Sequence, residues 1–147
     1  LEIVYKGLNN IIFKDFAHSP SKVRASCKSV NNAFQNLKKI YCLELHTFSS
    51  LDINFIKRYS GTMDSADEIL ILYDKKIILK RNKIIINSSE LKNAFGNKYL
   101  EIYFSAVDLC EYLYNKNWDN SLFLFMSSGN YGGISWKKLI KSFSVKK

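Results

Sequence analysis

The sequence lacks the long apolar run that a membrane-spanning helix needs. No apolar stretch among its 147 residues approaches about 18 residues, so we expect no membrane partner. The first ten residues, LEIVYKGLNN, also lack the basic and apolar regions of a secretion signal. With 47% hydrophobic and 24% charged residues, the composition is typical of a soluble globular protein, and the length suits one domain.

Metal-binding spacings are absent as well. Cys27, Cys42 and Cys110 are scattered, and His18 and His46 are the only histidines, so the paired Cys or His spacing of a zinc site does not occur. A metal pair formed by the two histidines lacks an evident third ligand, and we predict no metal site. We expect the three cysteines to be buried, reduced thiols of a cytoplasmic protein.

The net charge of +9 does not follow a nucleic-acid-binding pattern. The lysines occur singly or in pairs between apolar residues, and neither an RNA-binding aromatic signature nor a helix-turn-helix pattern is present. The pairs are Lys38-Lys39, Lys75-Lys76 and Lys137-Lys138. We therefore expect a solvated basic surface and no nucleic-acid partner, with a general attraction for small anions as the alternative.

Strand and helix patterns alternate along the chain. Short apolar runs predict strands at 1–6, 10–16, 39–45, 68–74, 99–104 and 121–126. Apolar residues at helical spacing predict helices at 20–37, 50–59, 88–96, 105–116 and 134–143. Segment 77–86 predicts a small excursion or hairpin. Alternation of this kind is typical of an α/β, Rossmann-like three-layer domain, with a mostly parallel sheet of about six strands and helices on both faces.

Three polar loops follow predicted strands. They are DFAHSP (15–20), LHTFSS (45–50) and SSGNYGG (127–133). Ligands of such sheets bind outside the carboxyl ends of the strands, so these loops mark the candidate site. Ser19 can cap the helix that begins at Pro20, where the missing N–H costs nothing. The glycines of the third loop can expose backbone N–H groups to an anion, or simply form turns.

Asp15 and His18 each allow two interpretations. The Asp15 carboxylate can accept hydrogen bonds from a sugar diol, or from its own loop backbone. His18 can donate to a phosphate, or can be a loop histidine whose hydrogen bonds are satisfied within the protein. Composition and spacing thus indicate an α/β domain that binds an anionic ligand, and they do not name a reaction.

Two segments resemble a known family. KDFAHSPSKVRAS (14–26) resembles the D-[YF]-A-H-x-P signature that opens the C-terminal domain of the Mur ligases, which are ATP-dependent amide ligases of peptidoglycan assembly. MSSGNYGG (126–133) resembles the MSNGGFGG segment of the branch that joins L-Ala-γ-D-Glu-meso-diaminopimelate to UDP-N-acetylmuramate during murein recycling. The resemblance runs along essentially the whole chain, including the order of strands and helices.

The resemblance implies that residues 1–147 are the C-terminal domain of a longer ligase of the bacterial cytoplasm. It implies that Asp15 holds the ATP ribose, that Phe16 lies beside the nucleotide, and that His18 lies near the nucleotide and a domain interface. ATP phosphates and Mg²⁺ would be bound mainly by a central domain outside this chain. We therefore expect the chain to contain no catalytic residue of its own and to be inactive alone.

The resemblance also implies a site for the amine substrate. The residues expected to bind it are His46, Thr47, Ser49, Ser127, Ser128 and Asn130. His46 matches the related ligases, whereas Thr47 and Ser50 replace their arginines. Neutral donors suit a long peptide better than one small amino acid held by a bidentate clamp. The alternatives are a UDP-N-acetylmuramate–L-alanine ligase and a non-catalytic nucleotide-binding α/β module.

Overall fold

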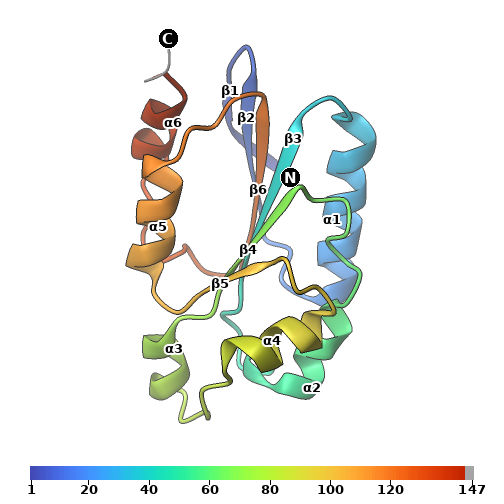
Figure 1. Ribbon diagram of the computed structural model, residues 1–147, viewed down its shortest axis with the longest axis vertical. Coiled ribbons are helices and arrows are strands. Elements are labelled where there is room, and N and C mark those ends of the chain that lie inside the picture. The colour runs from blue at the N-terminus through green and yellow to red at the C-terminus, as the bar shows by residue number, and fades with distance from the viewer. Residues whose placement is uncertain (145–147) are drawn as a thin grey trace.

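A six-stranded sheet forms the middle layer of the computed structural model, which describes residues 1–144 (Figure 1). The strand order is β1-β2-β6-β3-β4-β5. The strands are β1 (Glu2–Lys6), β2 (Asn10–Asp15), β3 (Lys38–Glu44), β4 (Glu68–Leu72), β5 (Glu101–Tyr103) and β6 (Ser121–Met126). Only the β1–β2 pair is antiparallel, and the other four pairs within the described chain are parallel.

Helices cover both faces of the sheet (Figure 1). One face carries α1 (Pro20–Ala33), α2 (Ile53–Ile56) and α4 (Ser88–Phe95), and the other carries α5 (Ala106–Asn115) and α6 (Trp136–Ser144). A short helix, α3 (Lys75–Lys80), follows β4. The predicted α/β, Rossmann-like three-layer fold is confirmed. None of the helices within residues 1–144 has the length and apolar character to cross a bilayer.

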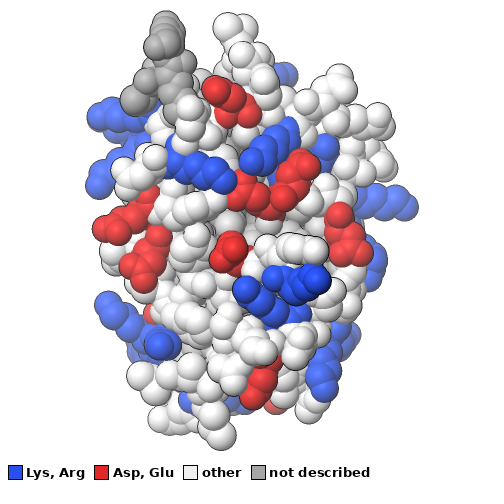
Figure 2. Space-filling model, viewed as in Figure 1, with Lys and Arg blue, Asp and Glu red and all other residues white. Residues whose placement is uncertain are grey.

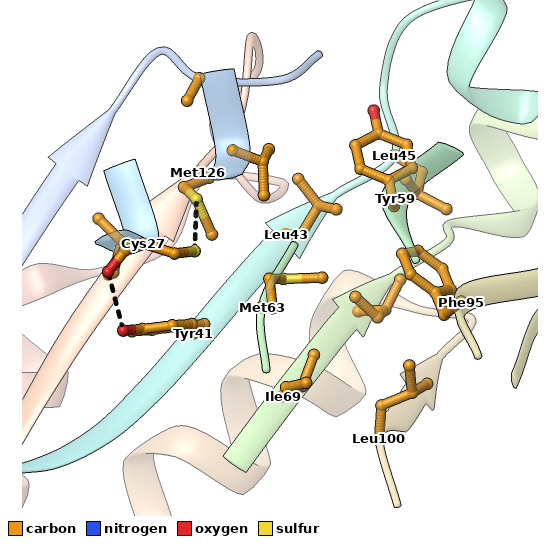
Figure 3. Packing of buried hydrophobic residues seen from close by; sticks show 14 of the residues in the cluster. Cys27, Tyr41, Leu43, Leu45, Tyr59, Met63, Ile69, Phe95, Leu100 and Met126 are labelled. Atoms are coloured by element: carbon orange, nitrogen blue, oxygen red, sulfur yellow. Dashed lines mark hydrogen bonds between the residues drawn. The ribbon is translucent and has the colours of Figure 1, made fainter. Parts of the chain in front are cut away.

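Strand alternation divides the core into two clusters. Along β3, Tyr41 and Leu43 face α1 and α2, while Ile40 and Cys42 face α5 and α6, because successive side chains point to opposite faces. All six residues of the central strand β6 are buried, as expected for a strand covered by helices on both sides. Figure 3 shows the first cluster, where the Tyr41 hydroxyl donates to the Cys27 carbonyl at 3.3 Å.

Three local predictions were wrong. Helix α1 ends at Ala33 rather than at residue 37, although Phe34 and Leu37 still pack against the core. Ser19 occupies the N-cap position of α1 without forming a side-chain cap bond. Cys110 is only partly buried, whereas Cys27 and Cys42 are fully buried.

Two segments differ from their predicted structure because an aspartate caps a helix in each. The region 50–59 is not one helix but is divided at Asp52, whose carboxylate accepts the Asn54 and Phe55 N–H groups and so starts α2. The 3₁₀ turn η1 (Ser49–Leu51) precedes α2, and a second 3₁₀ turn, η2 (Lys57–Tyr59), follows it. Segment 77–86 is not a hairpin, since Asp74 accepts the Lys76 N–H and starts α3. Local capping bonds compete with strand pairing in this way.

An ion network ties the amino ends of β3 and β4 to the end of α5. Glu68 accepts bonds from Lys38 (2.8 Å), Lys116 (2.9 Å) and the Tyr112 hydroxyl (2.7 Å). Burial alone would raise the pKa of the Glu68 carboxyl, but these donors outweigh it and lower the pKa from 4.5 to about 2. On the face drawn in Figure 2, basic and acidic side chains are interspersed.

This lowered pKa predicts a pH-dependent contribution to stability. A carboxyl whose pKa falls on folding stabilises the protein above its unfolded pKa of 4.5, and this contribution disappears as the pH falls towards about 2. Because the Glu68 side chain remains 21% exposed, solvent screens it, and we expect Glu68→Gln to lower the unfolding free energy by about 1–2 kcal/mol at pH 7.

Urea unfolding of the 147-residue chain at a series of pH values measures this effect. The difference between wild type and Glu68→Gln should shrink steadily below pH 4.5. Glu111→Gln on the exposed face of α5 removes a carboxylate without a hydrogen-bond partner in residues 1–144 and is the matched control. A Glu68→Gln deficit that stayed constant down to about pH 2 would contradict the assignment of the lowered pKa.

Candidate functional site

The parallel pairing brings the three polar loops to one edge of the sheet. Met126 at the end of β6 is paired with Asp15 at the end of β2 and with Leu43 near the end of β3. The segments after these strands, which begin at residues 16, 45 and 127, therefore leave the same carboxyl edge. The sequence placed the candidate site here, and the structure brings the loops together.

The Asp15 carboxylate is partly engaged inside its own loop. One oxygen accepts the Ala17 N–H at 3.2 Å, and the other accepts the Ser26 hydroxyl from α1. A carboxylate has about four lone-pair sites, so these two bonds leave acceptor capacity for a ligand. The loop-backbone interpretation of Asp15 is thus realised, and the ribose-binding interpretation stays a prediction that this geometry permits.

Phe16 and His18 form an exposed pair beside Asp15. The Phe16 ring is 66% exposed and meets the His18 ring edge-on with centroids 5.2 Å apart. The His18 Nδ1–H donates to the Phe16 carbonyl at 2.9 Å, because a carbonyl can only accept. Nε2 of the neutral ring is then an acceptor, so donation from Nε2 to a phosphate requires the cationic ring. The Tyr59 hydroxyl donates to the His18 carbonyl and fixes this loop against η2.

A buried glutamate that the sequence analysis missed organises the third loop. Glu44 ends β3 and is 4% exposed. Its Oε1 accepts the Ser127 hydroxyl at 2.5 Å and the Tyr131 N–H at 3.1 Å. Ser127 Oγ in turn accepts the Gly129 N–H at 2.7 Å. The signal for Glu44 was present in the sequence, as the one acid within the otherwise apolar end of KIYCLEL.

Gly129 is required by close packing. A Cβ on this residue would lie 2.8 Å from Glu44 Oε1 and 2.9 Å from His46 Cδ2. His46 Nδ1 is buried and has no hydrogen-bond partner among residues 1–144. A buried N–H without an acceptor is costly, so the neutral ring favours the tautomer with its proton on Nε2. His46 therefore offers an Nε2–H donor.

The predicted substrate-binding hydroxyls fall into two groups. The Ser127 proton is directed to Glu44, and the Thr47 hydroxyl donates to Ser50 Oγ at 3.0 Å, so both are used within the protein. The side chains of Ser49, Ser128 and Asn130 form no hydrogen bond within the described part of the chain. These three polar groups are free for a ligand.

Two adjoining hollows lie between the end of β2 and the loop after β6. The smaller, about 190 Å³, has a wall of aromatic and aliphatic side chains: Phe125, Tyr131, Ile134 and Trp136. The larger, about 530 Å³, extends past Phe16 and Ser128 to the start of β1. Both are lined by Lys14, Asp15, Ser127 and Gly129. Lys14 is a second residue that the sequence analysis missed, and it adds a cation to the site.

Some of the predicted site residues line the hollows, and others do not. Asp15, Phe16, Ser127, Ser128 and Asn130 line one or both of them. Loop 45–50 lines neither, although His46 lies against Gly129. Across residues 1–144 the acidic, histidine and cysteine side chains form no group of three that could hold a metal ion.

Sequence comparisons relate part of the chain to two curated ligases. No family model matches the chain. The UDP-N-acetylmuramate–L-alanine ligase of Chlorobium chlorochromatii is 31% identical over 71 residues, which is 48% of this chain and 15% of that ligase. The corresponding ligase of Brachyspira hyodysenteriae is 30% identical over 60 residues, which is 41% of this chain and 13% of the ligase. The aligned part is thus a small fraction of each ligase.

Structural comparisons extend over nearly the whole chain. A domain of a UDP-N-acetylmuramate:L-alanyl-γ-D-glutamyl-meso-diaminopimelate ligase from Haemophilus ducreyi superposes with a TM-score of 0.68 at 20% identity, over 97% of this chain and 98% of that one. A murein peptide ligase from Psychrobacter arcticus gives 0.70 at 16% identity, over 96% of this chain and 29% of its own. UDP-N-acetylmuramate–alanine ligase from Thermotoga maritima gives a TM-score of 0.67 at 14% identity, over 99% of this chain and 30% of that ligase. The fold expected from the resemblance is thus confirmed, since the chain shares it with these ligase structures.

The Glu44 network predicts a specific loss of stability. Glu44→Ala leaves the Ser127 hydroxyl and the Tyr131 N–H without their acceptor, and hydrogen bonds to a charged group contribute about 1.5–3 kcal/mol each. We expect the unfolding free energy of the chain, measured in urea, to fall by about 3 kcal/mol or more. Glu44→Gln is the matched control, because its amide oxygen can accept both bonds and its deficit should be less than half as large. Equal deficits for the two variants would show that the acceptor role is unimportant.

Proposed function

We propose that this chain is the C-terminal domain of a Mur ligase and forms one wall of the active site of an ATP-dependent amide ligase; its fold and its DFAHSP loop support this. The ligase would join L-Ala-γ-D-Glu-meso-diaminopimelate to UDP-N-acetylmuramate in the bacterial cytoplasm. One observation carries the proposal: the DFAHSP and SSGNYGG loops meet at the carboxyl edge, where Asp15 lines both hollows. Residues 1–147 would be the C-terminal part of a longer ligase.

The nucleotide end of the site would be built on the loop after β2. Asp15 retains acceptor capacity for the two ribose hydroxyls, and the exposed Phe16 ring offers a surface for the base. Lys14 lines the same hollows and supplies positive charge towards the phosphates. The phosphates and Mg²⁺ would be held mainly by a central domain. There the terminal phosphoryl group of ATP would pass to the muramoyl carboxylate with release of ADP, and the amine would then displace phosphate.

The loop after β6 would position the amine substrate. Glu44 and Ser127 fix its backbone, so that Ser128 and Asn130 are held with free polar groups beside the nucleotide hollow. His46 would add its Nε2–H donor. Ser127 and Thr47 are already bonded within the protein, and we now assign them to shaping these loops rather than to direct substrate contact.

The second candidate is ligation of L-alanine. It is supported by the two sequence relatives, which are UDP-N-acetylmuramate–L-alanine ligases. The peptide is supported by the MSSGNYGG segment and by a site of several dispersed neutral donors, which suits a substrate held by many contacts. Closure of such a wall over a central domain would exclude water from the acyl phosphate.

We expect Asp15→Ala in the full-length ligase to lower kcat/KM for ATP by about 10- to 150-fold, because hydrogen bonds from the ribose to a charged acceptor contribute about 1.5–3 kcal/mol. Steady-state kinetics with varied ATP measure this. Asp52→Ala is the matched control, since Asp52 also accepts local backbone N–H groups but lines neither hollow. Unchanged ATP kinetics in Asp15→Ala would identify Asp15 as a turn residue only.

We expect the full-length ligase to use the tripeptide in preference to free L-alanine. Ser128→Ala and Asn130→Ala should each raise the tripeptide KM by about 3- to 10-fold, the effect of one neutral hydrogen bond, without changing the KM for ATP. An amide-forming assay with each amine in parallel measures both quantities. Efficient ligation of free L-alanine, without ligation of the tripeptide, would replace the first candidate with the second. Failure to ligate either amine would indicate a non-catalytic nucleotide-binding module.

A further inference from the structure

The segment between α3 and α4 places a lysine over the loop that follows β3. Lys83 Nζ lies 4.1 Å from the centroid of the Phe48 ring. The two loops are neighbours because β3 and β4 are paired, and the Leu45 N–H donates to the Leu72 carbonyl at 2.9 Å just beyond the pairing. A cation from one loop therefore faces LHTFSS, which contains no arginine or lysine of its own.

The position of Lys83 is fixed by the backbone around it. Asn82 adopts a left-handed conformation (φ +54°), which reverses the chain after α3. The Lys83 N–H then donates to the Ile78 carbonyl at 3.1 Å, and the Ile86 N–H donates to the Tyr73 hydroxyl at 3.1 Å. Ile78 is fully buried, so the segment is anchored in the core. Lys83 is thus held in place rather than carried on a free loop.

The charge of Lys83 is not neutralised within the described chain. The salt bridges of residues 1–144 join Lys38 and Lys116 to Glu68, and none involves Lys83. The π-face of Phe48 attracts the ammonium group but carries no net charge. Lys83 is only partly exposed, so its charge is less screened than that of a fully solvated lysine. This arrangement can bind an anion next to the loop of His46.

Lys83 lies away from the nucleotide hollows. The strand order places β2, which carries Asp15 and Lys14, two strands away from β3 and three from β4. Neither hollow is lined by Lys83 or Phe48. If ATP occupies the β2 end of the edge, an anion bound by Lys83 at the β3–β4 end would belong to another substrate.

We propose that Lys83 binds a carboxylate of the amine substrate, an inference that rests on the proposed ligase function. Every amino acid or peptide that such a ligase joins through its amine also carries a carboxylate. An ammonium group held on the Phe48 ring, in the loop that also contains His46, recognises that carboxylate by charge. Lys83 is therefore a specificity-determining residue, and segment 74–87 is part of the substrate site.

The test compares variants of the full-length ligase in an amide-forming assay. Lys83→Met should raise the KM for the amine substrate about tenfold while the KM for ATP stays the same, and Lys83→Arg should largely restore the wild-type value. Analogues of the amine substrate, each with one carboxylate replaced by a carboxamide, locate the contact: for one analogue, wild type and Lys83→Met should become equal. Lys98→Met is the matched control, because Lys98 also lies over an aromatic ring, 5.2 Å from the Tyr99 centroid, between α4 and β5.

Two results would overturn the assignment while leaving the ligase function intact. One is an active Lys83→Met variant with an unchanged amine KM. The other is an increase in KM that is the same for the natural substrate and for every carboxamide analogue, which would indicate a structural role. A wild-type ligase that forms no amide with either amine would instead overturn the proposed function, and the Lys83 assignment with it.

Discussion

The parallel pairing of β6 with β2 on one side and β3 on the other is the constraint on which the site depends. Both partners are in register with Met126, so segments distant in the sequence end at the same level of the sheet. Packing on both faces fixes this register, because a slip by one residue would turn the apolar side chains of β6 away from their clusters. The meeting of Asp15, Ser127 and Glu44 follows from the pairing.

The sequence predicted the elements that depend on apolar periodicity. The six strands and the helices packed on them appear where those patterns lie, since burial of one or both faces requires apolar residues at a regular spacing. It failed at α3, where the apolar run IILKRNKIII resembles a strand pair and the Asp74 cap decides for a helix. Whether a helix begins at a capping residue depends on local hydrogen bonds, and the spacing of apolar residues does not determine it.

The sequence indicated which loops meet, but not the hydrogen bonds that their polar groups form. The polar loops were expected at one edge of the sheet, and they do lie together there. The sequence does not tell which of their polar groups are hydrogen-bonded within the protein itself. The hydroxyls of Ser127 and Thr47 are bonded internally, whereas the side chains of Ser128 and Asn130 form no hydrogen bond in the described part of the chain. Glu44 and Lys83 contact residues far away in the sequence or in another loop. A pattern within one segment contains no sign of such partners.

The close approach of Gly129 to Glu44 and His46 has a consequence for how this loop can diverge. A Cβ at position 129 would force the side chains of Glu44 and His46 to shift, and the hydroxyl of Ser127 is bound to Glu44. Residues 127, 129 and 131 therefore form an inward-facing set, and substitutions at these positions would destabilise the loop. Residues 128 and 130 alternate with them, and their side chains form no hydrogen bond within residues 1–144. The side chains at these two places can change over evolutionary time while the scaffold beneath them stays the same.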